Sequence, residues 1–263
     1  MVTAAEQTPK KVKSAGRALE IVDFVAEHGS VTFQDVVDYG LPKSSAHGLL
    51  ATLVESGWLE HSTQTRRYRL GLRAWQVGHS YQGHQILLET SQDVMDDTVA
   101  RVGETVQLAR LEGIENVYIA IRLSPKPMRM ASTVGMRLHA HATGIGKALL
   151  STLDPGEARR RLESVALPRL TPNTVTDVDE LMRVIGRSRD LGYAVDDEEF
   201  IEGCRCVAVP VAAEDETGVC AAMSVTMPTS RTDDRWPHSM YPVLREGANR
   251  IRSAMGLSGA LSP

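Results

Sequence analysis

Residues 41–57 read LPKSSAHGLLATLVESG and predict an amphipathic helix with a polar outer face. Pro42 suits the start of a helix, where its missing N–H would have no partner, and Gly57 marks the end. Apolar residues recur at helical spacing between them, so one side is expected to be buried. The other side carries short polar side chains that are able to reach base edges or phosphates. The apolar side comprises Ala46, Leu50, Leu53 and Val54.

Two helices are predicted before this one. The first covers residues 14–28, with Ser14 as its N-cap and Gly29 as its end. The second is short: Thr32 is its expected N-cap, and Asp35 stands in the capping-box position three residues later. The apolar stripe of the first helix comprises Ala18, Leu19, Ile21, Val22 and Val25.

A β-hairpin is predicted after the third helix. Strand-like residues 57–61 and 67–70 flank the polar segment STQTR. Three helices followed by a two-stranded hairpin predict a winged helix-turn-helix over residues 14–71, and double-stranded operator DNA is its expected partner. A polar helix face and a basic hairpin are, taken singly, equally consistent with solvated surface; their order favours DNA binding. The candidate DNA contacts are Arg17, Lys43, Ser44, Ser45, His47, Gly48, Thr52, Arg66 and Arg67.

Composition limits the class of protein. The chain has 263 residues, which is enough for two domains, and its net charge of −4 argues against a protein that coats nucleic acid non-specifically. It contains no apolar run long enough to span a membrane, and three cysteines form no disulfide framework. Residues 1–13 have no signal-peptide core and are expected to be a disordered tail, so we expect a cytoplasmic protein without membrane association.

A helical connector is predicted between the two domains. Residues 72–84 read as a linker helix weakened near Gly78 and Gly83, and helical spacing resumes over residues 85–102. Winged-helix proteins generally read two half-sites as symmetric dimers, so this region is a candidate for self-association. Packing of residues 85–102 on their own domain is an equally good interpretation. Their apolar stripe comprises Ile86, Leu87, Val94, Thr98 and Val99.

Residues 85–263 predict an α+β domain, an antiparallel sheet flanked by helices. Strands are expected over residues 105–111, 116–123 and 127–134, and two more lie within 204–228, joined by an acidic turn. Helices are expected over residues 145–153, 154–165, 176–192 and 236–256, with Thr176 capping the third of them.

The segment HAHATGIGKA, residues 139–148, suggests an anion site at a helix start. A nucleotide-binding P-loop is excluded, because His141 and Ala148 stand where that motif needs glycine and a hydroxyl residue. Thr143 is able to cap the helix, which leaves the amides of Gly144, Ile145 and Gly146 to face a small anion.

Two other chemistries fit these residues less well. The HAH and CRC pairs allow a zinc site, but structural zinc ligands usually have two or more intervening residues, so no metal or other cofactor is expected. Cys206 with His141 is the best nucleophile–base pair, and the carboxylates of residues 196–199 read as a solvated loop; neither makes a persuasive enzyme.

Taken in order, these stretches resemble the IclR family of bacterial transcriptional regulators. The resemblance runs from GRALEIVDFVAEHG through LPKSSAHGLLATLVESGWLEH, YRLGLRAWQVG, HATGIGKALLS and LTPNTVTD to LGYAVDDEEFIEGCRCVAVPV and AAMSVTMP. It implies a winged helix for the operator, a linker helix used in dimerisation and a GAF-like domain that binds a small organic acid. It also implies a homodimer or a dimer of dimers, and we expect a repressor without enzymatic activity.

The resemblance also implies an effector site. Backbone amides at Gly144 and Ile145 would hold the effector carboxylate. Three positions depart from the family pattern: Gly48 replaces a usual arginine, His139 replaces a usual proline, and Thr226 stands where some relatives have serine. The polar contacts implied are Asp196, Cys206, Ser224 and Thr226, and the apolar wall implied is Met130, Leu138 and Cys204.

Overall fold

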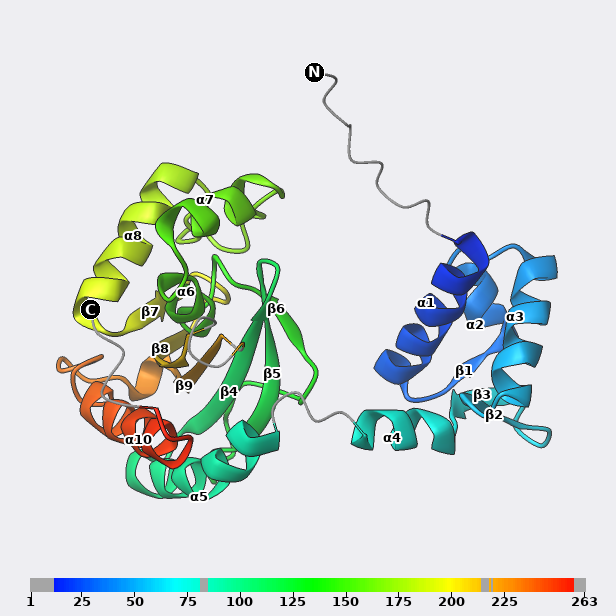
Figure 1. Ribbon diagram of the computed structural model, residues 1–263, viewed down its shortest axis with the longest axis horizontal. Coiled ribbons are helices and arrows are strands. Elements are labelled where there is room, and N and C mark those ends of the chain that lie inside the picture. The colour runs from blue at the N-terminus through cyan, green and yellow to red at the C-terminus, as the bar shows by residue number, and fades with distance from the viewer. Residues whose placement is uncertain (1–11, 81–84, 214–217, 219, 258–263) are drawn as a thin grey trace. The chain divides into compact units, whose positions relative to one another are not determined.

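A computed structural model describes residues 12–80, 85–213, 218 and 220–257 of the chain. The chain divides into two compact units, residues 1–83 and 84–263, each with its own hydrophobic core. Figure 1 shows both units. Most of the predicted tail, and the acidic turn near residue 215, lie outside the described residues. Among the described residues, no helix is long and apolar enough to cross a membrane.

The N-terminal unit has the predicted three helices and hairpin. Thr32 and Asp35 form the predicted capping box: the Thr32 amide donates to Asp35 Oδ2 at 2.7 Å, and the Asp35 amide donates to Thr32 Oγ1 at 3.2 Å. An additional short strand, β1, pairs antiparallel with β3, which gives the sheet order β1-β3-β2. The elements are α1 (Lys13–His28), β1 (Val31–Thr32), α2 (Phe33–Asp38), α3 (Lys43–Glu55), β2 (Leu59–Ser62), β3 (Arg67–Leu70) and α4 (Leu72–His79).

Two details of the first helix were predicted wrongly. α1 begins at Lys13, so Ser14 lies inside the first turn, and its flanking residue Val12 makes no side-chain cap. Leu19 is 63 % exposed, whereas Ile21 and Val25 are fully buried against α3. The buried stripe is narrower than the sequence indicated, because a helix in a small unit contacts its neighbours along only one side.

The C-terminal unit is a six-stranded antiparallel sheet in the order β6-β5-β4-β9-β8-β7. Helices α6, α7 and α8 cover one face, and α5 and α10 cover the other (Figure 1). The elements are α5 (Gln85–Val102), β4 (Thr105–Glu112), β5 (Glu115–Arg122), β6 (Arg137–His139), α6 (Gly144–Ser151), α7 (Pro155–Glu163), α8 (Val178–Leu191), β7 (Ala194–Asp197), β8 (Cys204–Ala212), β9 (Ala221–Pro228), the 3₁₀ turn η1 (Thr229–Arg231) and α10 (Tyr241–Ala254).

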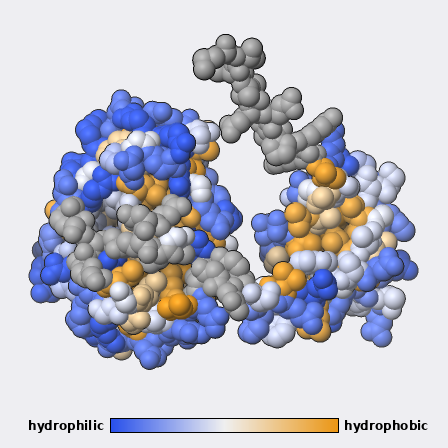
Figure 2. Space-filling view, viewed as in Figure 1, coloured by the Kyte–Doolittle hydropathy of each residue, from blue (hydrophilic) through white to orange (hydrophobic). Residues whose placement is uncertain are grey.

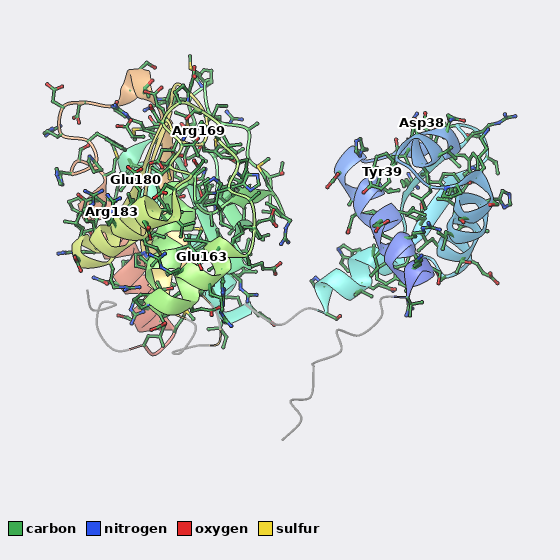
Figure 3. All side chains as sticks on the ribbon, turned by 90° about the horizontal axis from the view of Figure 1, so that it is seen from above. Asp38, Tyr39, Glu163, Arg169, Glu180 and Arg183 are labelled. Atoms are coloured by element: carbon green, nitrogen blue, oxygen red, sulfur yellow. The ribbon has the colours of Figure 1, made fainter. Side chains whose placement is uncertain are left out.

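The outer helices α7 and α8 are polar on their solvent side. Figure 2 shows hydrophilic surface over this part of the unit, and Figure 3 shows Glu163, Glu180 and Arg183 on these two helices. All three residues are exposed. The buried side of α8 contributes Leu181 and Ile185 to the core beneath α6. These helices therefore shield the α6 face of the sheet.

Several predictions for this unit were wrong. Residues 127–134 form no strand; Pro125 and Pro127 lack the N–H that a ladder needs, and the strand that pairs with β5 is β6. Asp177, not Thr176, caps α8, accepting from the Glu180 amide at 2.8 Å.

Helix α5 packs on its own unit rather than standing free. Leu87, Val94 and Thr98 are buried against α10 and the sheet, whereas Ile86, predicted in the same stripe, is 64 % exposed. Of the two interpretations that the sequence allowed for residues 85–102, the structure shows packing on the same unit.

Candidate functional site

The third helix presents the predicted polar face to solvent. Lys43, Ser44 and His47 are exposed, and Ser45 is half-buried. The Thr52 hydroxyl donates to the Gly48 carbonyl at 2.9 Å, so its proton is committed to the helix and only its lone pairs remain for DNA. A Cβ at Gly48 would meet no atom within 4 Å, so this glycine is not required by packing.

The two wing arginines differ in their surroundings. Arg66 lies at the hairpin turn with φ of 54°, is exposed, and has no ion-pair partner among the described residues. Arg67 donates from Nε to Ser30 Oγ at 3.0 Å and from Nη2 to the Ser30 carbonyl at 2.7 Å. Arg66 is therefore free to contact a phosphate, whereas Arg67 ties β3 to the segment between α1 and β1. Arg17 is half-buried on α1.

The N-terminus of α6 has the predicted cap. Thr143 Oγ1 accepts from the Gly146 amide at 3.1 Å, and no described residue accepts from the amides of Gly144 or Ile145. A Cβ at Gly146 would lie 2.2 Å from Ala140 Cα, so only glycine allows this close approach. A Cβ at Gly144 would lie 3.1 Å from Cys206 Sγ. The helix start therefore sits directly on the sheet with two amides free.

Lys147 does not point at a free anion site. Its side chain is 1 % exposed, and the ammonium forms a buried ion pair with the Glu199 carboxylate. Asp196 and Glu199, predicted to lie on a solvated loop, are 6 % and 9 % exposed. Residues 194–197 form the edge strand β7, which packs against α6, and Glu199 lies in the turn that follows. The anion held by this lysine is therefore part of the protein.

The LTPNT segment braces the turn after β7. Thr171 Oγ1 donates to the Glu198 carbonyl at 2.7 Å and Thr174 Oγ1 to the Glu199 carbonyl at 2.6 Å. His141, fully buried, places Nε2 3.0 Å from the Pro168 carbonyl and so ties the loop before α6 to this segment. The pKa of His141 is lowered, chiefly by burial, so it is neutral near pH 7.

Seven of the nine expected effector residues line one pocket between α6 and the sheet. Gly144 adjoins Cys206 at its edge, and Ser224 lies next to Gln107 on the sheet. The pocket volume is about 10 Å³, which is room for roughly one water molecule, so a larger occupant must push its walls apart. The lining residues are Tyr118, Met130, Leu138, Thr143, Ile145, Asp196, Phe200, Ile201, Cys204, Cys206 and Thr226.

Asp196 is the acidic group of this pocket. Its Oδ1 accepts from the Glu199 amide at 2.7 Å and the Phe200 amide at 3.3 Å. Burial raises its pKa to about 7, against the opposing effect of nearby Lys147. Its protonated form is therefore populated near neutral pH, and the pocket then presents a carboxylic acid rather than a charge.

The cysteines of the pocket are poor nucleophiles. Burial raises the pKa of Cys204 to about 11 and that of Cys206 to about 12, so both are thiols at neutral pH. The His139 and His141 ring centroids are 5.7 Å apart. Among the described residues, no group of three or more His, Cys, Asp or Glu side chains is placed to hold a metal ion.

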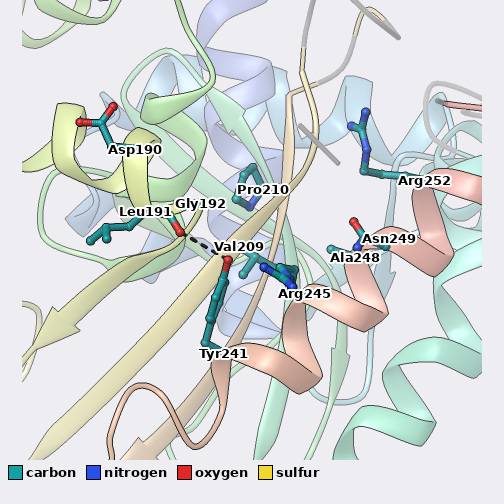
Figure 4. Close-up of a pocket in the computed structure, with 10 residues that line it drawn as sticks. All are labelled: Asp190, Leu191, Gly192, Val209, Pro210, Tyr241, Arg245, Ala248, Asn249 and Arg252. Carbon is teal, nitrogen blue, oxygen red and sulfur yellow. Dashed lines mark hydrogen bonds between the residues drawn. The ribbon is translucent and has the colours of Figure 1, made fainter. Parts of the chain in front are cut away.

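A second, larger cavity of about 260 Å³ lies between the end of α8, β8 and α10 (Figure 4). Tyr241 donates across it to the Leu191 carbonyl at 3.3 Å, and the Arg245 guanidinium lies 5.5 Å from the Tyr241 ring. No expected effector residue lines this cavity. The α6 pocket is therefore the better candidate despite its small volume.

Comparison with known families decides the class of protein. A family model described as "Bacterial transcriptional regulator IclR C-terminal" matches residues 79–253, and one described as "IclR helix-turn-helix domain" matches residues 14–62. The chain belongs to the IclR family. IclR proteins are transcriptional regulators, which agrees with the class of protein predicted from the sequence.

Individual IclR relatives cover nearly the whole chain. The regulator XynR of Escherichia coli strain K12 is 34 % identical over 93 % of this chain and 98 % of its own, and the repressor AllR of the same strain is 32 % identical over 94 % and 92 %. A crystal structure of an IclR homologue complexed with 4-hydroxybenzoate, from Microbacterium hydrocarbonoxydans, has a TM-score of 0.78 at 28 % identity and covers 92 % of this chain and 99 % of its own. The IclR of Thermotoga maritima has a TM-score of 0.71 at 28 % identity, covering 93 % and 99 %.

Some residues of the IclR pocket were missed from the sequence. Tyr118, Phe200 and Ile201 line it, but each looked like an ordinary strand or loop residue. The ion pair of Lys147 with Glu199 was also missed, because 52 residues separate the two in sequence. They come together only because β7 pairs antiparallel with β8.

Proposed function

We propose that this chain is a sequence-specific repressor whose affinity for operator DNA is modulated by a small carboxylate-bearing metabolite. One observation carries the effector half of the proposal. Two free amides at the start of α6 adjoin a pocket that also holds a protonatable carboxyl, two thiols and a threonine hydroxyl. Helix amides with the dipole behind them favour an anion, and the apolar wall suits a short carbon skeleton.

Two relatives support this direction. AllR is named a repressor, and the Microbacterium homologue was crystallised with the aromatic acid 4-hydroxybenzoate. The pocket in this structure is much smaller than a benzoate. We therefore expect either that the effector is a smaller acid, or that Met130 and Ile201 of the flanking loops move outward when it binds.

The DNA-binding half rests on α3 and the wing. Lys43 and Arg66 supply exposed positive charge, and Ser44 and His47 supply short polar contacts. Effector binding shifts the operator-bound population only to the extent that the acid prefers one arrangement of the dimer or tetramer. A regulator of this type acts on the chromosome in the cytoplasm.

Self-association completes the proposal. Helix α4 exposes Leu72 at 62 % and Trp75 at 63 %, the latter stacked on His79 with ring centroids 5.0 Å apart. An exposed apolar face of this kind suits pairing with a second copy. A homodimer, or a dimer of dimers, would place two α3 helices on one operator.

The test combines DNA binding with ligand binding. Gel-shift titrations use DNA from the promoter region upstream of the protein's own gene, with random competitor DNA, and are repeated with a panel of small carboxylic acids. We expect sequence-specific binding that at least one acid weakens, and that acid should raise the melting temperature of the free protein. Equal affinity for promoter and competitor DNA would remove the DNA-binding half; no response to any acid would remove the effector half.

A further inference from the structure

The closed pocket beneath α6 has one wall that is weakly held. Residues 129–134 lie in the segment that joins β5 to β6, and Met130 of this stretch lines the pocket. Among the described residues, their only hydrogen bonds are to residues 126 and 136 of the same segment. None of the six residues is fully buried. This stretch is called the flap below.

The other walls of the pocket are firmly held. Tyr118, Cys206 and Thr226 belong to strands of the sheet, and each is no more than 6 % exposed. The turn after β7 contributes Phe200 and Ile201, and it is braced by two threonine hydroxyls of the LTPNT segment and by the buried ion pair described above. The pocket has room for roughly one water molecule, so an acid enters only if a wall moves. The flap is the wall with the fewest bonds to break.

Both ends of the flap are fixed. At its C-terminal end, the Gly135 amide donates to the Tyr118 carbonyl at 2.8 Å. Gly135 has a φ of 87°, a conformation that glycine adopts without a steric cost. At its N-terminal end, Arg231 Nη1 donates to the Met128 carbonyl at 2.9 Å. The flap can therefore rotate outward between these two points while β5 and β6 stay paired.

Arg231 is itself held by a buried carboxylate. Its Nε and Nη2 donate to the two oxygens of Glu104 at 2.7 and 2.6 Å, and Lys126 Nζ pairs with the same carboxylate at 2.7 Å. The Glu104 side chain, directly before β4, is 3 % exposed. A bidentate pair of this kind fixes the plane of the guanidinium, so its third nitrogen is directed at the Met128 carbonyl. Arg231 thus connects the base of the flap to the sheet.

We propose that the flap opens to admit and release the effector, and that the bond from Arg231 to the Met128 carbonyl keeps it closed. This inference rests on the proposed function, in which the pocket receives a small acid. Loss of the bond raises the population of the open flap, whether the pocket is empty or occupied. An acid should then associate and dissociate faster, with little change in its dissociation constant.

The pocket cysteine Cys206 reports opening without any acid. Cys206 lines the pocket, whereas Cys220 is equally buried beside Thr152 at the end of α6 and does not line it. The full-length protein is treated with methyl methanethiosulfonate, and peptide mass spectrometry gives the rate of modification of each cysteine. In Arg231→Met we expect Cys206 to react about tenfold faster than in wild type, the effect of one lost hydrogen bond to a charged donor. Cys220 should react at the wild-type rate.

Arg235→Met is the matched control. Arg235 is exposed and pairs with Asp233, so its loss should leave both rates unchanged. If Arg231→Met does not fold, Arg231→Lys keeps a positive charge beside Glu104. Its single nitrogen cannot also reach the Met128 carbonyl, so Cys206 should again react faster.

Three results would overturn the inference. The first is an unchanged rate at Cys206 in Arg231→Met. The second is equal acceleration at Cys206 and Cys220, which would report loosening of the whole unit. The third is acceleration of Cys206 by Thr171→Ala and not by Arg231→Met, which would place the opening at the turn after β7.

The proposed function is judged separately, because the labelling needs no acid. If acids bind but the rate at Cys206 does not depend on Arg231, the role of the flap is wrong and the effector site stands. If Cys206 responds as expected but no acid binds, the effector site is wrong, and with it the role of the flap in effector entry.

Discussion

Lys147 of α6 and Glu199, in the turn after β7, form a buried ion pair that joins α6 to the edge of the sheet. Lys147 follows the free amides by two residues, and Glu199 supplies the backbone amide that Asp196 Oδ1 accepts at 2.7 Å. The ion pair thus links α6, which begins with the two free amides, to the turn whose amides hold Asp196.

Removing one partner of the ion pair is expected to destabilise the C-terminal unit. Lys147→Met leaves the Glu199 carboxylate buried and unpaired, which should lower the free energy of unfolding by about 3–5 kcal/mol. Urea denaturation followed by circular dichroism measures the loss. The double variant Lys147→Met/Glu199→Leu should recover much of it; equal losses in the single and double variants would contradict the argument.

The raised pKa of Asp196 predicts a pH dependence. Between about pH 4 and 7 the folded protein binds a proton at Asp196 that the unfolded chain releases, so this group's contribution to stability falls as pH rises and is constant above about 7. Asp196→Asn should remove that decline. The free energy of unfolding of the variant minus that of wild type should therefore be larger at pH 8 than at pH 4. Denaturation curves at both pH values provide the measurement, and a pH-independent difference between the two proteins would contradict it.

The same titration should control binding of acids. Above pH 7 the Asp196 carboxylate is charged and repels an anionic effector, so affinity should fall between pH 6 and pH 8 by several-fold. Asp196→Asn should bind with little change over this range. Calorimetry with the acid that gives the largest thermal shift tests this; a similar pH profile in both proteins would assign the effect to another group.

Gly144 is expected to be essential for effector binding but not for DNA binding. A side chain at this position would meet Cys206 Sγ and the Asp196 amide nitrogen, each 3.1 Å from the Cβ, and push α6 off the sheet. Gly144→Val should abolish the acid-induced thermal shift while operator affinity changes little. Gly186→Ala is the matched control, because a Cβ there meets nothing within 4 Å. A normal acid response in Gly144→Val would place the effector elsewhere.

The two wing arginines should differ in their effect on DNA binding. Arg66→Ala should weaken binding and reduce the slope of log affinity against log salt by about one phosphate contact, with unchanged stability. Arg67→Ala should lower the stability of the N-terminal unit, because it removes two hydrogen bonds to Ser30. Arg235→Ala, an exposed change in the other unit, is the control. Identical salt slopes for Arg66→Ala and wild type would show that the wing tip does not touch DNA.

Helix α4 is expected to contribute to self-association. Trp75→Ser removes its largest exposed apolar side chain and should shift sedimentation profiles toward smaller species at micromolar concentration. Val134→Ser, which changes a residue 65 % exposed in the C-terminal unit, should leave them unchanged. If both variants assemble like wild type, the pairing surface is not on α4.

The winged helix could be predicted nearly complete from the sequence. Its signals are local: the capping box of Thr32 and Asp35, the Pro42 helix start and the apolar spacing of α3 all act within a few residues. The start of α6 was predictable for the same reason, since Thr143 and the glycines after it lie within one turn. The strand expected over residues 127–134 does not form, although the apolar pattern favours it, because proline lacks the N–H that strand pairing needs.

The chemistry of the pocket depended on the tertiary structure. The sequence, with the family resemblance, placed Asp196 among the effector residues, but only its position in β7 buries it and raises its pKa. Glu199 was expected on a solvated loop, and only the tertiary structure places it against Lys147. Side-chain patterns within a few residues determine local structure. The burial of a side chain, and the residues it contacts, depend instead on which distant strands pair. Burial and contacts in turn determine the charge and the hydrogen bonds of each polar group.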